Sequence, residues 1–277
     1  MNDWLQNPAV QAGIVPFLVA LVLGLLLART RFLAAGVIAG LAVLLALTIG
    51  FALEPMTSVR KLILVTFGSG ALALVLEAAG TTARRSVAGA VAVVAGLASV
   101  WIVLRVLQQK ETGPALIAGA AAALFVIATV GALLECSTDP LRASVIGTCL
   151  GWGSGALAVL GASALLGQIG IALGTACAGL ALAQMLRGGP APSGWTTALP
   201  AGLGAALVGV AAVATGELRW YFLLPLLLVP FAARLVPGGG TRRPWQHAFL
   251  AGFAALVPVI AAIGWAWMSA RMQASAG

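Results

Sequence analysis

Ten apolar stretches, each close to the length of a membrane-spanning helix, follow one another along this chain of 277 residues. A helix needs about 20 mostly apolar residues to cross the hydrocarbon core of a bilayer. Backbone groups in lipid must be satisfied within their own segment, so such stretches form helices rather than strands. The sequence therefore predicts an all-α, polytopic integral membrane bundle with about ten transmembrane helices and short loops.

The predicted spans are separated by short breaks that carry most of the charge. The first five cover 9–28, 32–53, 62–80, 87–107 and 115–134. The second five cover 143–166, 169–186, 198–215, 221–236 and 248–268. Short connections make consecutive helices antiparallel neighbours. We predict one transmembrane domain over 1–277, with 1–140 and 141–277 as its candidate halves.

The composition excludes a water-soluble protein. The chain is 61% hydrophobic and only 8% charged, whereas an average soluble domain is roughly one quarter charged. No segment between the spans is long enough for a soluble catalytic domain. A soluble enzyme, a nucleic-acid-binding protein and a disordered chain are therefore excluded as descriptions of the whole molecule.

The net charge of +8 comes from fifteen basic residues scattered between the apolar stretches. This pattern is typical of loops that face anionic lipid, so we expect membrane lipids as partners of the loop arginines and no nucleic acid. An N-terminus outside the cell leaves nine of the fifteen basic residues inside, which the positive-inside rule favours. Thirteen arginines against two lysines are typical of a GC-rich bacterial genome. We predict a multi-pass protein of a bacterial inner (plasma) membrane.

The chain lacks sequence patterns for metal binding or catalysis. Its single histidine is His247, and Cys136, Cys149 and Cys177 have no metal-ligand spacing. No phosphate-binding loop, nucleophile elbow or zinc-protease motif is present. We therefore predict no metal ion, no cofactor and no catalytic residue.

Glu77 is the acidic residue placed deepest in a predicted span, about one turn inside the end of the third. An ionised acid in hydrocarbon must be paired or become protonated. Pairing with an arginine on the same side would make Glu77 structural, whereas a free carboxyl would couple a proton or cation to transport. The arginines on that side include Arg29, Arg31, Arg84, Arg85, Arg142 and Arg187.

Two further acids, Glu135 and Asp139, lie with Arg142 in the break after the fifth span. The pair Asp139-Pro140 predicts an N-cap and first residue for the sixth helix. On the other side of the membrane we predict ion pairs at the interface among Glu54, Arg60, Lys61 and Arg105. Trp101 lies deeper in its span, and we expect it to take part in helix packing.

Prolines interrupt three predicted spans: Pro16 the first, Pro225 and Pro230 the ninth, and Pro258 the tenth. Each removes a backbone donor and leaves a carbonyl group that needs protein or water as a partner in lipid. Broken helices of this kind either form ordinary kinks or border a substrate site in transporters.

The sixth and seventh spans form one long apolar stretch, for which the sequence predicts a break at Gly167-Gln168. Glycines recur every four residues in it, so each set lies on one face of its helix, where small residues let two backbones approach closely. We predict a tight hairpin or, alternatively, a seam that slides during transport. The glycines are Gly147, Gly151 and Gly155 in the sixth span and Gly170 and Gly174 in the seventh.

These features favour a small permease or transporter-like protein of undetermined substrate. The alternative is a non-catalytic accessory subunit that packs against a membrane-protein partner or a second copy of the chain. A membrane-embedded lipid enzyme has weaker support, because it would need a cluster of acids, histidines or arginines, and only the Glu135–Arg142 break offers one.

Overall fold

The structure is a computed structural model that describes residues 7–27, 30, 32, 35–48, 50, 54, 56–80, 85–161, 163–187, 194–216, 218–237 and 243–276, with side chains described as far as residue 272. These residues contain ten α-helices and no strand. The prediction of an all-α membrane bundle is confirmed.

The helices follow the order of the predicted spans. The first five are α1 (Val15–Leu26), α2 (Ala35–Thr48), α3 (Ser58–Ala78), α4 (Arg85–Leu107) and α5 (Thr112–Glu135). The second five are α6 (Pro140–Gly161), α7 (Ala164–Arg187), α8 (Trp195–Thr215), α9 (Leu224–Arg234) and α10 (Pro244–Ala276). A π-helix, η1 (Val10–Ile14), precedes α1, and a 3-10 helix, η2 (Trp220–Leu223), precedes α9.

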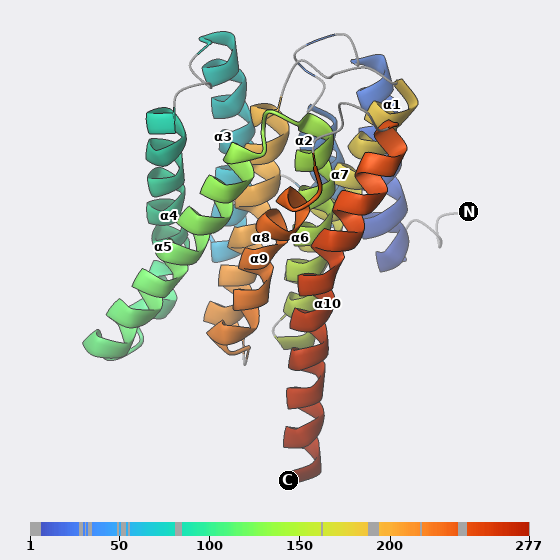
Figure 1. Cartoon of the computed structure of the whole chain (residues 1–277). Helices are drawn as coiled ribbons and strands as arrows, with labels where there is room; N and C mark the ends of the chain where they lie inside the picture. The colour runs from blue at the N-terminus through green and yellow to red at the C-terminus, as the bar shows by residue number, and fades with distance from the viewer. Residues whose placement is uncertain are drawn as a thin grey trace.

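Among the described helices, α3 to α8 and α10 are seven that are long and apolar enough to cross a membrane. The segments 10–26, 35–48 and 220–234 are apolar but shorter. The last helix, α10, extends past the other helices at its C-terminal end (Figure 1). The structure therefore supports a multi-pass membrane protein in which three of the ten predicted spans are shorter than expected.

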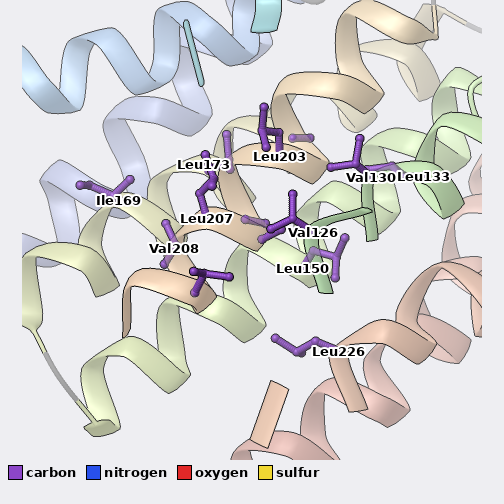
Figure 2. Packing of buried hydrophobic residues seen from close by; sticks show 14 of the residues in the cluster. Val126, Val130, Leu133, Leu150, Ile169, Leu173, Leu203, Leu207, Val208 and Leu226 are labelled. Atoms are coloured by element: carbon purple, nitrogen blue, oxygen red, sulfur yellow. The ribbon is translucent and has the colours of Figure 1, made fainter. Parts of the chain in front are cut away.

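The helices α6, α7 and α8 form the centre of the bundle. In α8 every residue from Trp195 to Ala212 is buried. Apolar side chains of α5, α6, α7 and α8 meet there, with Leu226 of α9 approaching from one side (Figure 2). Peripheral helices leave large apolar side chains exposed, such as Ile117 and Phe253, as expected where lipid takes the place of water.

The glycines of α6 and α7 lie where the two backbones approach each other closely. A Cβ atom added to Gly151 would lie 2.5 Å from the backbone nitrogen of Gly174, and one added to Gly170 would lie 2.6 Å from the Cα atom of Gly155. Gly147 faces Cys177 of α7 and Ala201 of α8 instead. The hairpin is thus packed backbone to backbone, and any side chain at Gly151 would collide with a main chain.

The predicted break at Gly167-Gln168 is wrong, because both residues lie inside α7. The helix begins earlier, since the carbonyl oxygen of Ser163 already accepts a hydrogen bond from the Gly167 nitrogen at 3.0 Å. Serine is favoured immediately before a helix. Ser163, and not the Gly167-Gln168 pair, therefore marks the beginning of α7.

Pro16 lies in the first turn of α1, directly after the π-helix η1. In a regular α-helix the residue at its position would donate to the carbonyl of Ala12, and proline cannot. The Thr175 hydroxyl of α7 lies 2.9 Å from that carbonyl oxygen and 3.1 Å from the carbonyl oxygen of Ala172 in its own helix. A neighbouring helix therefore supplies the donor that Pro16 removes.

The prolines near the C-terminus occupy two kinds of position. Pro225 does not interrupt a helix, because it lies in the first turn of α9, where a proline costs no helical hydrogen bond. Pro230 and Pro258 lie inside α9 and α10, and both are buried. Each of these two helices therefore lacks one internal hydrogen bond on a protein-facing side.

Candidate functional site

Six side chains converge at the end of the bundle where α5 and α9 end and where α6 and α10 begin, which lies at the top of Figure 1. We call this group the polar clamp. Its members are Glu135, Cys136, Asp139, Arg142, Arg234 and His247.

Arg234, the last residue of α9, joins that helix to the end of α5. Its Nη2 atom lies 2.7 Å from Oε2 of Glu135, and its Nε atom donates to Sγ of Cys136 at 3.2 Å. It also donates to the backbone carbonyl oxygen of Ala132. The carbonyls of the last helical turn lack internal donors, so Arg234 satisfies one of them while it pairs with the acid.

Asp139 caps the beginning of α6. Its Oδ1 atom accepts a hydrogen bond from the backbone nitrogen of Arg142 at 3.1 Å, which is the N-cap geometry predicted from Asp139-Pro140. The Nε atom of Arg142 lies 3.4 Å from Oδ2 of Asp139. Arg142 also donates from Nη2 to the carbonyl oxygen of Val236 at 3.0 Å, which fixes the end of α9 to α6.

His247 joins the beginning of α10 to Asp139 across 108 positions of sequence. Its Nε2 atom lies 2.8 Å from Oδ2 of Asp139, and its side chain is only 4% exposed. An ionised carboxylate only accepts hydrogen bonds, so Nε2 carries the proton. The other ring nitrogen, Nδ1, is buried and has no hydrogen-bond partner among the described residues.

The polar clamp therefore holds the α9–α10 hairpin against the α5–α6 turn through two independent links. In the first link, Arg234 of α9 bonds to Glu135 and Cys136. In the second link, Asp139 pairs with His247 of α10 and with Arg142, and Arg142 bonds to Val236 at the end of α9. The clamp brings together two acids, two guanidinium groups and one imidazole. Across the described residues, no three His, Cys, Asp or Glu side chains gather in a group suited to a metal ion.

At the opposite end of the bundle, the α9–α10 hairpin is held together by its own aromatic rings. Tyr221 of η2 stacks on Trp265 of α10 with ring centroids 5.1 Å apart, and Phe222 meets Trp265 edge-on at 5.4 Å. Aromatic pairs of this geometry contribute about 0.5–1.5 kcal/mol beyond burial. At this end, aromatic contacts hold η2 and α10 of the hairpin together. At the other end, the polar clamp joins the hairpin to the rest of the protein.

Below the clamp, the contacts of this hairpin with α6 are mainly apolar. Leu226 of α9 and Val259 of α10 both lie against Gly153, within 3.3 Å of where its Cβ atom would be. The Cys149 thiol of α6 lies 3.9 Å from the carbonyl oxygen of Gly252. Among the described residues, no ion pair joins the hairpin to α6 at this level.

The predicted site residues fall into two groups. Glu135 and Asp139 belong to the clamp, and Pro225, Pro230 and Pro258 lie on the hairpin that it holds. Glu77 lies in the last turn of α3, and its predicted partners Arg29, Arg31 and Arg84 lie outside the described residues. Its pairing therefore remains a prediction.

Sequence reasoning did not predict the roles of Arg234 and His247. A signal existed, because both residues end or begin predicted spans on the same side of the membrane as Glu135 and Asp139. No protein family matches this chain, and no curated protein matches it.

Proposed function

We propose that the protein is a small permease in which the α9–α10 hairpin is the moving element and the polar clamp is its gate on the cytoplasmic side. The observation that carries this proposal is the placement of the links. In the part of the chain that the structure describes, the ion pairs between the hairpin and the α5–α6 turn all lie at one end of the hairpin, and mainly apolar contacts with α6 continue below them.

The proposal draws further support from the prolines and the aromatic rings. Pro230 and Pro258 remove one helical hydrogen bond from each helix of the hairpin, where bending costs least. Tyr221, Phe222 and Trp265 keep the two helices together, so the hairpin can move as one body. Rocking of one rigid helical unit against another is a common form of alternating access in transporters.

Two native cysteines test the opening of this gate. Cys149 lies below the clamp against α10, whereas Cys177 lies in the α6–α7–α8 centre, which does not move in the proposal. In native membranes, a small maleimide should modify Cys149 faster than Cys177. Asp139→Asn should accelerate modification of Cys149 alone. Equal protection of both thiols in both proteins, or a joint increase, would contradict gating by the hairpin.

Transport itself is tested with a disulfide bond that fixes the hairpin to α6. The Cγ1 atom of Val145 in α6 lies 3.4 Å from where the Cβ atom of Gly252 would be. A cysteine carries its Sγ atom at this γ position, so we choose the pair Val145→Cys/Gly252→Cys, in a Cys149→Ser background, for a disulfide. Proteoliposomes are offered a panel of labelled amino acids, sugars, nucleosides and inorganic ions. We expect uptake of one class above that of empty liposomes, abolished by oxidation of the pair and restored by reduction.

A second candidate, a non-catalytic accessory subunit, is favoured by α10. This helix has 33 residues and extends past the bundle (Figure 1), and its exposed Trp267 and Met268 lie on the extension. A protein that is stable only together with a co-purifying membrane partner would favour this function. A protein that is monodisperse alone and passes the transport test would favour the permease.

A further inference from the structure

Lys61 places a buried positive charge where α3 begins beside the last turns of α4. The residue is only 8% exposed. Its Nζ atom donates to the carbonyl oxygen of Trp101 at 3.3 Å and lies 4.4 Å from the centroid of the Trp101 ring. The nearby Ser58 hydroxyl donates to the carbonyl oxygen of Ile102 at 3.1 Å, so α3 is fixed against α4 at this level.

The ion pair predicted for Lys61 is absent from the described residues. No described carboxylate, including that of Glu54, lies within ion-pair distance of its ammonium group. An ammonium group has three donors, and one carbonyl oxygen and one ring face do not neutralise it. Lys61 also lies in the first turn of α3, where the helix dipole disfavours a cation. An anion beside this ammonium group would offset the cost of burying its charge.

The surroundings of Lys61 match the two parts of a phospholipid. Trp101, which was expected in helix packing, is 45% exposed, and Leu97 and Leu104 are exposed beside it. Positions 97, 101 and 104 lie on one face of α4, so they form an apolar stripe along the helix. Arg105, one turn after Trp101, is exposed and adds a second cation at the end of the stripe.

We propose that Lys61, Trp101 and Arg105 form a binding site for an anionic phospholipid. The headgroup phosphate meets the Lys61 ammonium and the Arg105 guanidinium, and an acyl chain lies along Leu97, Trp101 and Leu104. Anionic headgroups are recognised by basic pockets between transmembrane helices. This site is far from the polar clamp in sequence and does not depend on the permease proposal.

The chain contains only two lysines, and the second provides a matched control. Lys110 is exposed in the turn between α4 and α5, beyond the end of α4 that Lys61 contacts. The purified full chain in detergent is heated with added phosphatidylglycerol, phosphatidylcholine or inorganic phosphate, and the rise in melting temperature is measured for wild type, Lys61→Gln, Lys61→Arg and Lys110→Gln. Native mass spectrometry then gives the apparent affinity for phosphatidylglycerol.

We expect phosphatidylglycerol to raise the melting temperature more than phosphatidylcholine does. Lys61→Gln should lose this difference and bind phosphatidylglycerol about fivefold more weakly, the effect of one basic side chain at a membrane surface. Lys61→Arg and Lys110→Gln should retain both. Equal effects of the two lipids, an unchanged affinity in Lys61→Gln, or an equal effect of inorganic phosphate would each overturn the proposal. Because the lipid-dependent rise is compared within each variant, a lower basal stability of Lys61→Gln does not obscure the result.

Discussion

Thr175 of α7 supplies a hydrogen-bond donor to the carbonyl oxygen of Ala12, 2.9 Å away, in the segment where Pro16 removes one. The hydrogen bond thereby joins α7 to the segment η1–α1 at the place where Pro16 removes a backbone donor. In lipid such a carbonyl must find a partner in the protein, and this relationship shows how a proline-containing helix is accommodated inside the bundle.

Thr175→Val should therefore destabilise the protein. It leaves the Ala12 carbonyl without the hydroxyl donor, and an unsatisfied buried polar group costs about 1–3 kcal/mol. Pro16→Ala restores a backbone donor at that place, so the double variant should recover most of the loss. The measurement is thermal unfolding in detergent for the two single variants and the double variant.

Thr48→Val is the control for this prediction, since the bond that the described residues give the Thr48 hydroxyl is to the carbonyl oxygen of Leu44 in its own helix. It should change the melting temperature little. If the effects of Thr175→Val and Pro16→Ala simply add, the hydroxyl does not replace the donor that Pro16 removes.

Gly151→Ala should destabilise the protein clearly, although alanine is a better helix former than glycine. The added methyl group would lie 2.5 Å from the backbone nitrogen of Gly174, and a main chain cannot rotate away as a side chain does. Overpacking of a tight core typically costs about 1–3 kcal/mol. The midpoint of thermal unfolding in detergent measures the effect.

Gly264→Ala in α10 is the matched control, because its added Cβ would have no described atom within 4 Å beyond its chain neighbours and the nearby backbone of its own helix. Helix propensity alone should leave Gly264→Ala neutral or slightly more stable. Should both alanine variants behave alike, close backbone contact between α6 and α7 is not what holds the hairpin together.

Whether a feature of this structure can be predicted from the sequence depends on how far apart in the sequence the interacting residues lie. The helices were predictable because lipid forces each span to satisfy its own backbone, so apolar length alone is informative. The contact between Gly151 and Gly174 was within reach too, since residues four apart on a helix share a face. Both arguments need only local sequence.

The polar clamp depends instead on which helices are neighbours. His247 pairs with Asp139 over 108 positions, and Arg234 meets Cys136 over 98. Nothing in the local sequence of α10 says that its first turn lies beside α6 rather than another helix that begins on that side. Lys61 presents the same difficulty, because its expected carboxylate partner is replaced by the ring and carbonyl of Trp101, which only the packing of α3 against α4 brings near.

The two acids of the polar clamp should differ strongly in their effect on stability. Glu135 is 64% exposed in its pair with Arg234, and exposed ion pairs contribute about 0–1 kcal/mol. Asp139 instead faces the buried His247 ring and Arg142, whose side chain is 13% exposed. Removing one partner of a buried charge leaves the other uncompensated, at a cost of about 3–5 kcal/mol. Asparagine still caps a helix well, so Asp139→Asn removes the charge and keeps the cap of α6. We expect Glu135→Gln to unfold within a few degrees of wild type in detergent and Asp139→Asn to unfold at a much lower temperature. A second substitution, Arg142→Gln in the Asp139→Asn protein, should recover part of that loss, because it removes the stranded guanidinium charge. Equal effects of Glu135→Gln and Asp139→Asn would show that the charge of Asp139 does not hold the α9–α10 hairpin in place.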